Sequence, residues 1–479
     1  MKNILPRKPR LLLYGLACFL PRASSRQTTT SNATLACNQA QSILGDSTVQ
    51  TPSDSDYAGA STAPWNLFNT QFKPACVVLP RNNTDVQVAM RSIFQFDVDY
   101  AVQAGGHSAM KGWNNVNNGV LISFERMDNI SYDAAKDTIT FEPAIRWGEI
   151  VATLESQGVA PVGGRIDDVG TGLLLGGGLS FLSPAHGFAA DNYVELDIVL
   201  VDGTLVTATE TNNYSDLFRA LKGGANRFGI YPNSSFDAVA QAVFHYVRDV
   251  EDPNAALLLY FGALVLPDGT LTSFSIANMF YNGNSLPNST YGELLSIPSI
   301  SQSLGPLSWP ELVASMAEPQ PANGHGQLFG ASVLAAGEDH DDLSFIDIVH
   351  KWQNFTFTFQ SQINSTVLAF TPVPVSQITV GKERGGNAID PPLIPYSAIQ
   401  FQLTLPLGVP TISSEMEEGR QLFFQEAPRS PGFPLYMNEC DVKQSVFETY
   451  GQYEFLKQTY MKYDPTRFNV RHTNGPQGL

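Results

Sequence analysis

The hydrophobic and polar positions in the first half of the chain follow a helical spacing in some segments and a strand-like pattern in others. Apolar residues recur at helical spacing from about Asn83 to Phe96 and again over Trp147–Gln157. Between these helices, short apolar and β-branched runs predict strands at Val77–Leu79, Asp99–Gln103, Gly119–Ser123, Thr138–Glu142 and Leu196–Val201. The last of these runs is apolar enough that we expect it to be buried. Short strands and helices that alternate in this way predict an α+β domain ending near Ile230.

A second region begins with an amphipathic helix at Phe236–Arg248, whose apolar side chains fall on one face. Strand-like runs then recur between proline-marked turns and the helix Leu343–Trp352. They lie at Ala256–Phe261, Leu271–Met279, Gly330–Ala336, Val367–Phe370 and Ala398–Leu403. This order predicts an antiparallel sheet covered by helices.

Composition narrows the class of protein. With 479 residues, 43% of them hydrophobic, the chain is long enough for two or three domains with large buried cores. Its formal net charge of −17 argues against a nucleic-acid partner, because phosphate binding requires clustered lysine and arginine. We interpret the acidity as a contribution to solubility.

The N-terminus has the order of a secretory signal peptide. Basic residues at positions 2, 7, 8 and 10 precede the apolar run Leu11–Leu20 and the small residues Ala23–Ser25. This run is too short to span a bilayer, and no other apolar run is long enough to do so, so we expect secretion and no membrane span. Eight Asn-X-Ser/Thr sequons support export, at Asn32, Asn82, Asn129, Asn213, Asn233, Asn288, Asn354 and Asn364.

Two glycine clusters carry the most informative chemistry. In VQAGGHSAM (Val102–Met110) a strand runs into a glycine turn that presents His107, and GGG (Gly176–Gly178) follows within VGTGLLLGGGLSF. Glycine pairs let backbone amides approach an anion closely. A strand rather than a helix follows the first turn, so the dinucleotide fingerprint is absent.

Seven motifs occur in the order found in one family. They are Gly105–Ser108, Trp147-Gly148, Gly163–Arg165, Leu175–Ser180, Gly187–Asn192, Val201–Gly203 and Leu221–Ile230. The chain therefore resembles the FAD-linked oxidases of the berberine-bridge-enzyme-like group in the vanillyl-alcohol oxidase superfamily, particularly its fungal secreted members. The likeness is strong over Phe72–Ile230 and returns at Leu435–Asn438 and Lys462–Phe468.

This resemblance implies the domain organisation. After the signal peptide (1–23) comes a PCMH-type FAD-binding domain (68–230) of two small subdomains that hold the pyrophosphate between them. A substrate-binding domain (231–433) and a C-terminal segment that returns to the flavin domain (434–479) complete the chain, which we expect to be a monomer.

The family also commonly has an N-terminal disulfide, and an oxidising compartment favours pairing of Cys37 with Cys76. Cys440 is then a buried, inert thiol. Metal-ligand spacing is absent from the sequence, so no metal site is expected.

The resemblance implies a covalent bond from His107 to the 8α-methyl group of FAD. Relatives often add a cysteinyl bond, but Ile166 stands at that position, so we expect no second bond. The expected cofactor-binding residues are Gly105, Gly106, His107, Ser108, Gly172, Gly176, Gly177, Gly178, Ser180, Asn192 and Ile230.

Two departures from the family pattern stand out. The segment Val169–Gly172 is one residue shorter than the usual VGxGG, and the strand that closes the flavin domain in relatives has no counterpart after Ile230. The second departure leaves open a catalytically impaired flavin-binding protein.

The family's chemistry transfers a hydride from a small-molecule substrate to the flavin and then two electrons to dioxygen, with release of hydrogen peroxide. Tyr436, Asn438 and Glu439 are the catalytic candidates, and Glu439 replaces a tyrosine that is often the base in relatives. Tyr396 and Gln402 are further candidates by position. We expect a substrate that is an alcohol or an oxidisable secondary metabolite. A carbohydrate oxidase is the alternative, although the missing cysteine argues against it.

Overall fold

A four-stranded sheet forms the first part of the fold. The computed structural model describes residues 31–223, 236–299, 301–316, 324–337 and 340–479. The sheet lies in the first of these ranges. Its strands are ordered β1 (Val49–Gln50), β2 (Cys76–Val78), β4 (Val120–Ser123) and β3 (Tyr100–Gln103). The last three are parallel, and β1 runs antiparallel to β2. Helices α1 (Asn32–Leu44) and α4 (Asn83–Phe96) share one apolar core with this sheet.

The predicted disulfide joins this sheet to its covering helix. Cys37 of α1 is bonded to Cys76 of β2, across a sequence separation of 39 residues. Closing a loop of that length stabilises the fold by roughly 3–4 kcal/mol if the effect is mainly on the unfolded chain. Cys440 is a free thiol and is buried, as expected.

Two hairpins complete the region before residue 224. One pairs β5 (Ile130–Asp133) with β6 (Thr138–Phe141), and the other pairs β7 (Glu195–Val199) with β8 (Leu205–Thr209). Helix α5 (Trp147–Glu155) follows the first hairpin and buries Trp147 and Ile150.

The expectation that the Leu196–Val201 strand is buried is wrong. Glu195 and Asp197 of β7 are exposed, and Leu196 is only half-buried. The polar residues that alternate with the apolar ones give this strand a solvent-facing side, which a count of apolar residues does not register. Within the described residues, β7 pairs with β8 alone.

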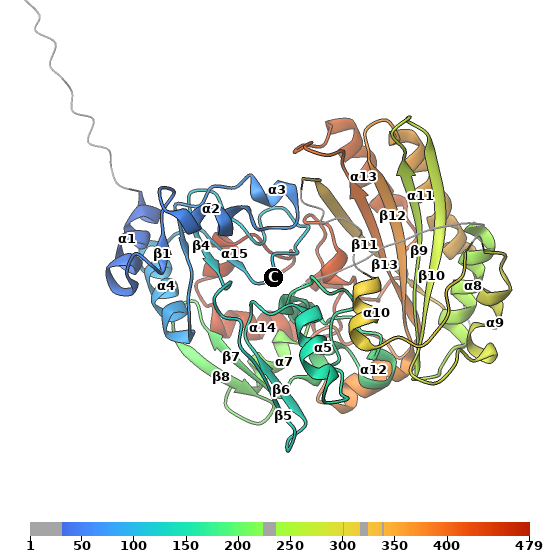
Figure 1. The fold of residues 1–479 in the computed structure, drawn as a ribbon, viewed down its shortest axis with the longest axis horizontal. Coiled ribbons are helices and arrows are strands. Elements are labelled where there is room, and N and C mark those ends of the chain that lie inside the picture. The colour runs from blue at the N-terminus through green and yellow to red at the C-terminus, as the bar shows by residue number, and fades with distance from the viewer. Residues whose placement is uncertain (1–30, 224–235, 300, 317–323, 338–339) are drawn as a thin grey trace, which may run out of the picture. The chain divides into compact units, whose positions relative to one another are not determined.

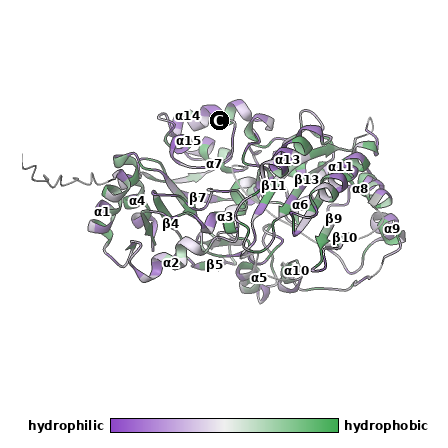
Figure 2. Ribbon diagram, turned by 90° about the horizontal axis from the view of Figure 1, so that it is seen from above, coloured by the Kyte–Doolittle hydropathy of each residue, from purple (hydrophilic) through white to green (hydrophobic). Residues whose placement is uncertain are grey.

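The second region is built on a five-stranded antiparallel sheet, confirming the predicted architecture (Figure 1). Its order is β10 (Leu271–Tyr281), β9 (Ala255–Val265), β12 (Ser365–Val373), β13 (Tyr396–Thr404) and β11 (Gln327–Ala335). Each predicted strand run of this region falls inside one of these strands or reaches one residue beyond it. Figure 2 shows the hydrophobic colour along β9, whose first nine residues are all buried.

Helices cover one face of this sheet. Odd-numbered residues of β9 and β13, such as Phe261 and Phe401, pack against α8 (Phe236–Asp249), α11 (Leu343–Phe359) and α13 (Ser414–Glu426). Alternate side chains of a strand point to opposite faces, so the even-numbered residues turn toward the glycine-motif loops. Leu258 and Tyr260 accordingly share a core with Trp147 and Leu173.

The C-terminal segment packs against elements from the start of the chain. In α14 (Tyr453–Tyr463), Tyr463 donates to Asp216 of α7 (Ser215–Leu221) over 2.7 Å. Phe468 of α15 (Phe468–His472) is buried in the core of the first sheet. Among the helices of the described ranges, none combines the length and apolar character needed to cross a membrane.

Candidate active site

The turn that carries His107 is fixed by a backbone contact between two glycines. A Cβ on Gly105 would lie 2.6 Å from the Cα of Gly170, and a Cβ on Gly170 would meet Gly105 equally closely. Neither position therefore has room for a side chain. Gly106 has a φ of +76°, which favours glycine at this step of the turn. The motif glycines thus have a packing role in addition to any contact with a ligand.

His107 lies between an aromatic ring and a carboxylate. Its imidazole stacks on Trp65 with ring centroids 4.5 Å apart and an interplanar angle of 15°. Its Nε2 is 3.4 Å from Oδ1 of Asp168. Trp65 in turn meets Phe329 of β11 edge to face at 6.3 Å, so the histidine turn is in contact with the large sheet through aromatic rings.

The Gly176–Gly178 cluster ends the 3₁₀ helix η1 (Thr171–Gly176). Gly177 and Gly178 have φ values of +97° and +76°, so the chain reverses where a side chain would be strained. A Cβ on Gly177 would lie 2.8 Å from Ile389. Ser180, just beyond, accepts from the Gly163 backbone N–H over 3.3 Å and so ties this turn to the Gly163-Gly164 motif.

Tyr436, Asn438 and Glu439 come together at this cluster. The Tyr436 hydroxyl oxygen accepts from the Leu179 backbone N–H at 3.1 Å and from Asn438 Nδ2 at 2.6 Å. Asn438 and Glu439 belong to the buried 3₁₀ helix η3 (Met437–Glu439). Burial raises the pKa of Tyr436 well above its usual range, so this phenol remains protonated at neutral pH.

Arg165 lies beside them, a residue that the sequence motifs did not mark as functional. Its side chain is buried, and its Nη1 donates to Thr371 Oγ1 of β12 over 3.3 Å. Burial lowers the pKa of this guanidinium, and its electrostatic interaction with buried Glu439 opposes that shift. The Arg165 loop, the large sheet and the C-terminal segment therefore bring one buried cation and one buried carboxyl group close enough to interact electrostatically.

A row of side chains crosses the face of the sheet next to Thr371. The register aligns Ile276, Tyr260, Ala369, Gln400 and Ala331 on the five neighbouring strands. Gln400 is buried, and its cross-strand neighbours on either side are the small residues Ala369 and Ala331.

Gln400 begins a chain of buried amides. Its Nε2 donates to Gln402 Oε1 at 3.5 Å, and Gln402 Nε2 donates to Gln327 Oε1 at 3.2 Å. Thr404 also donates to Gln327 Oε1, at 2.8 Å. The predicted candidate Gln402 is thus one member of a polar strip. Glutamines at alternate positions of a strand were the sequence signal for this strip.

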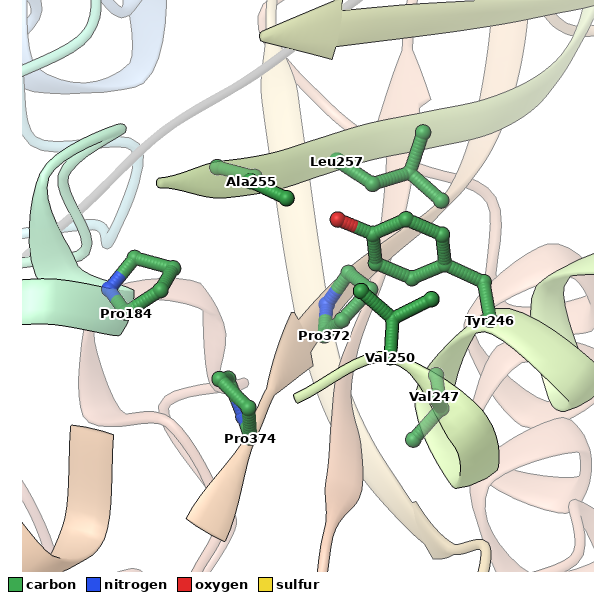
Figure 3. Close-up of a pocket in the computed structure, with 9 residues that line it drawn as sticks. Pro184, Tyr246, Val247, Val250, Ala255, Leu257, Pro372 and Pro374 are labelled. Carbon is green, nitrogen blue, oxygen red and sulfur yellow. The ribbon is translucent and has the colours of Figure 1, made fainter. Parts of the chain in front are cut away.

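Two small hollows adjoin this region. One is lined by both predicted tyrosines and by apolar residues from the glycine motif, the sheet and the C-terminal segment: Leu179, Phe188, Val373, Ile389, Tyr396, Ala398, Pro434, Leu435 and Tyr436. The other, shown in Figure 3, lies between Pro184, the end of α8 and β9. Among the side chains that line this second hollow, only Tyr246 carries a hydroxyl group. The hollow lined by Tyr396 and Tyr436 has more polar groups, so we place the candidate site there.

The polar groups around His107 and η3 fit FAD. Ser108 Oγ and Asn438 Oδ1 are buried, and no group of the described residues makes a hydrogen bond to either. Buried polar atoms in native proteins nearly always have a partner, so these two atoms fit a polar ligand between the two glycine turns. Gly105, Gly106 and Ser108 would hold its pyrophosphate, and Asn438 its ring system.

The structure gives no ligand-binding contact for three other predicted cofactor residues. Asn192 donates to the carbonyls of His186 and Phe188 and accepts from Arg384, so its amide holds the Gly187–Asn192 turn. Gly172 faces open space. Ile230 lies outside the described residues, as does the position of the absent strand that would follow it.

Comparison with known proteins supports the flavin assignment. Residues 74–209 match the family model of the FAD binding domain. An FAD-linked oxidoreductase of Arthroderma benhamiae is 27% identical over 447 residues, covering 83% of this chain and 85% of that protein. An FAD-dependent monooxygenase of Arthrobotrys oligospora is 27% identical, covering 93% and 89% of the two chains.

The fold comparison agrees. The glucooligosaccharide oxidase of Acremonium strictum, described as carrying a 6-S-cysteinyl, 8α-N1-histidyl FAD, superposes with a TM-score of 0.69 at 18% identity, covering 92% of this chain and all of that one. The chain has the α+β fold of the PCMH-type FAD-binding oxidoreductases. Its sequence is similar to FAD-linked oxidoreductases, and residues 74–209 match an FAD binding domain, as the sequence motifs predicted.

Proposed function

We propose that this protein is a secreted FAD-dependent oxidase. It oxidises an alcohol or a hydroxylated secondary metabolite and uses dioxygen as the electron acceptor. The observation that carries this proposal is the buried group formed by Arg165, Glu439 and Tyr436 between the glycine motifs and the polar strip of the sheet. When bound, FAD supplies the hydride acceptor and the route to dioxygen.

Glu439 is the proposed proton acceptor. Alcohol oxidation requires a base for the hydroxyl proton while the C–H bond breaks, and a carboxylate is suited to this task if it stays ionised. The Arg165 guanidinium favours the ionised form of Glu439, because opposite charges attract strongly where both are buried. Tyr436 and Asn438 are proposed to hold η3, and with it Glu439, against the glycine turn.

The sheet face supports a substrate that carries hydroxyl or carbonyl groups. Gln400 provides an amide between Ala369 and Ala331. Tyr260 lies in the same row, on the strand beyond Ala369. An amide can accept from a hydroxyl and donate to a carbonyl, so either group is suitable.

The proposal predicts a yellow protein that releases peroxide with a substrate. The purified protein is expected to show flavin absorption, to bleach when an alcohol, sugar or polyketide-like substrate is added without oxygen, and to recover its colour in air with one hydrogen peroxide per turnover. Heat-treated protein is the control. A colourless protein would instead support the impaired, flavin-free alternative. A coloured protein that hydroxylates its substrate would make it a monooxygenase.

Carbohydrate oxidation is the second candidate, favoured by the buried amides Gln400 and Gln402 and by the likeness to an oligosaccharide oxidase. A second, cysteinyl bond to the flavin would favour carbohydrate oxidation. Ile166 stands at the position of that cysteine, so the sequence argues against this candidate. Faster peroxide release with oligosaccharides than with any alcohol in the same panel would reverse our preference.

Export is proposed from the N-terminal pattern and the sequons. Six of the seven sequon asparagines in the described ranges are exposed, and Asn364 is half-buried. We expect protein from the host medium to begin after residues 23–26 and to shift in mobility on deglycosidase treatment. Asn354→Gln, an exposed change on α11, is expected to remove one glycan. An intact N-terminus and an unchanged mobility would contradict export.

A further inference from the structure

Asp168 and His107 face one another across two paired loops. The contact between Gly105 and Gly170 brings the two backbones together, with their Cα atoms too close for any side chain. His107 lies two residues after Gly105, and Asp168 lies two residues before Gly170. Close to this contact, Nε2 of His107 lies 3.4 Å from Oδ1 of Asp168.

The Asp168 loop is itself held firmly. The Trp147 backbone N–H donates to the Val169 carbonyl at 3.0 Å, and the Gly148 N–H donates to the Asp167 carbonyl at 2.9 Å. Arg146 Nη1 donates to the Asp168 carbonyl at 2.6 Å. Three bonds from one short segment thus fix the backbone on both sides of the Asp168 side chain, and a fixed carboxylate can orient an imidazole.

The charge state of the pair suits proton transfer. Burial alone would raise the pKa of Asp168, but the hydrogen bond and charge of His107, with Arg146 nearby, hold it below its ordinary value. Asp168 is therefore ionised at neutral pH and accepts the N–H on Nε2 of His107. That choice of tautomer leaves the lone pair of the neutral ring on Nδ1.

We propose that Asp168 is the positioning residue for covalent attachment of the flavin to His107, because it holds the tautomer in which Nδ1 is free to form the bond. This inference rests on the proposed covalent flavin. Asp168 fixes the Nε2–H tautomer, so Nδ1 meets the 8α-methyl group as a nucleophile, and it takes up the Nε2 proton once the bond has formed. Trp65 keeps the imidazole from turning about its side chain.

The overall step balances with dioxygen as oxidant. One C–H bond of the 8α-methyl group and the N–H bond of His107 break, and one C–N bond forms. The two electrons pass to the flavin and then to dioxygen, which takes up two protons and leaves as hydrogen peroxide. No group beyond FAD, dioxygen and this chain is needed.

Full-length protein variants test the inference through bond formation itself. Protein is freshly loaded with FAD in air, and the covalent fraction is followed over time by acid precipitation and by the mass of the His107 peptide. Asp168→Asn is expected to slow attachment by about 10²-fold or more, as loss of tautomer control does in a catalytic triad. Asp168→Glu is expected to retain most of the rate, and added formate to restore part of it in Asp168→Ala. Asp167→Asn, a change at the neighbouring carboxyl, is the matched control and is expected to behave as wild type.

The outcomes separate the two proposals. Stoichiometric non-covalent FAD and an unchanged melting temperature in Asp168→Asn show that a slow rate is not misfolding, and formate rescue is a readout that a structural role would not produce. Attachment at the wild-type rate in Asp168→Asn overturns the role of Asp168 alone. A histidyl-flavin that NMR shows to be linked through Nε2 overturns the tautomer assignment and the proposal with it. Wild-type protein with no flavin on His107 overturns both the covalent bond and this inference, whatever its oxidase activity.

Discussion

Replacing His107 with alanine is expected to abolish covalent flavin completely and to slow reduction of the flavin that remains. Wild-type protein precipitated with acid should give a yellow pellet, and the His107→Ala pellet should be colourless with all FAD in the supernatant. In the family that this chain resembles, the histidyl bond raises the flavin potential. Each 30 mV lost from a two-electron couple lowers the equilibrium constant for hydride transfer about tenfold, so reduction by substrate should slow by up to about that factor for each 30 mV.

The measurement pairs acid precipitation with anaerobic stopped-flow reduction at saturating FAD. His186→Ala is the matched control, because His186 lies in α6 (Ser183–His186) and its backbone carbonyl accepts from Asn192 and Arg384, which the substitution leaves in place. Flavin that stays with the protein in acid after His107→Ala would assign the covalent bond to another residue. A colourless wild-type pellet would remove the bond and leave the oxidase proposal standing.

Local patterns in the sequence predicted the elements of the fold well. Helix α4 and strand β13, for example, lie within a few residues of their predicted bounds, because periodicity and turn residues act over short distances. Each strand of the five-stranded sheet was also predicted to be a strand. The order in which the strands pair was not predicted, because β9 pairs with β12, which lies far along the chain, and only tertiary packing sets that pairing.

The candidate site was predictable only in its motif residues. His107 and the glycine clusters follow from turn chemistry and family order. Arg165 was visible as part of a motif, but its burial beside Glu439 depends on three chain segments meeting. The approach of Asp168 to His107 depends on a glycine contact between positions 65 residues apart in the chain, which no local pattern reveals.

Glu439→Gln is expected to have the largest effect on the reaction. A glutamine keeps the shape of the side chain but is no base, so flavin reduction by substrate should fall by about 10²–10⁴-fold, the usual contribution of a positioned base. Covalent flavin should remain, because Glu439 has no part in the proposed attachment at His107. Stopped-flow reduction without oxygen measures this step apart from the reaction with dioxygen.

Burial of Arg165 makes stability a necessary control for this variant. Arg165 and Glu439 are buried and interact electrostatically, and removing one of two opposite buried charges leaves the other uncompensated. Glu439→Gln should therefore also melt at a lower temperature. The double variant Arg165→Met/Glu439→Gln removes both charges and is expected to recover much of that stability without recovering flavin reduction. Glu383→Gln, at an exposed position of α12 (Val375–Glu383), is expected to change neither. If the double variant regains both stability and the wild-type rate of reduction, Glu439 is structural, and the base must be sought elsewhere on the sheet face.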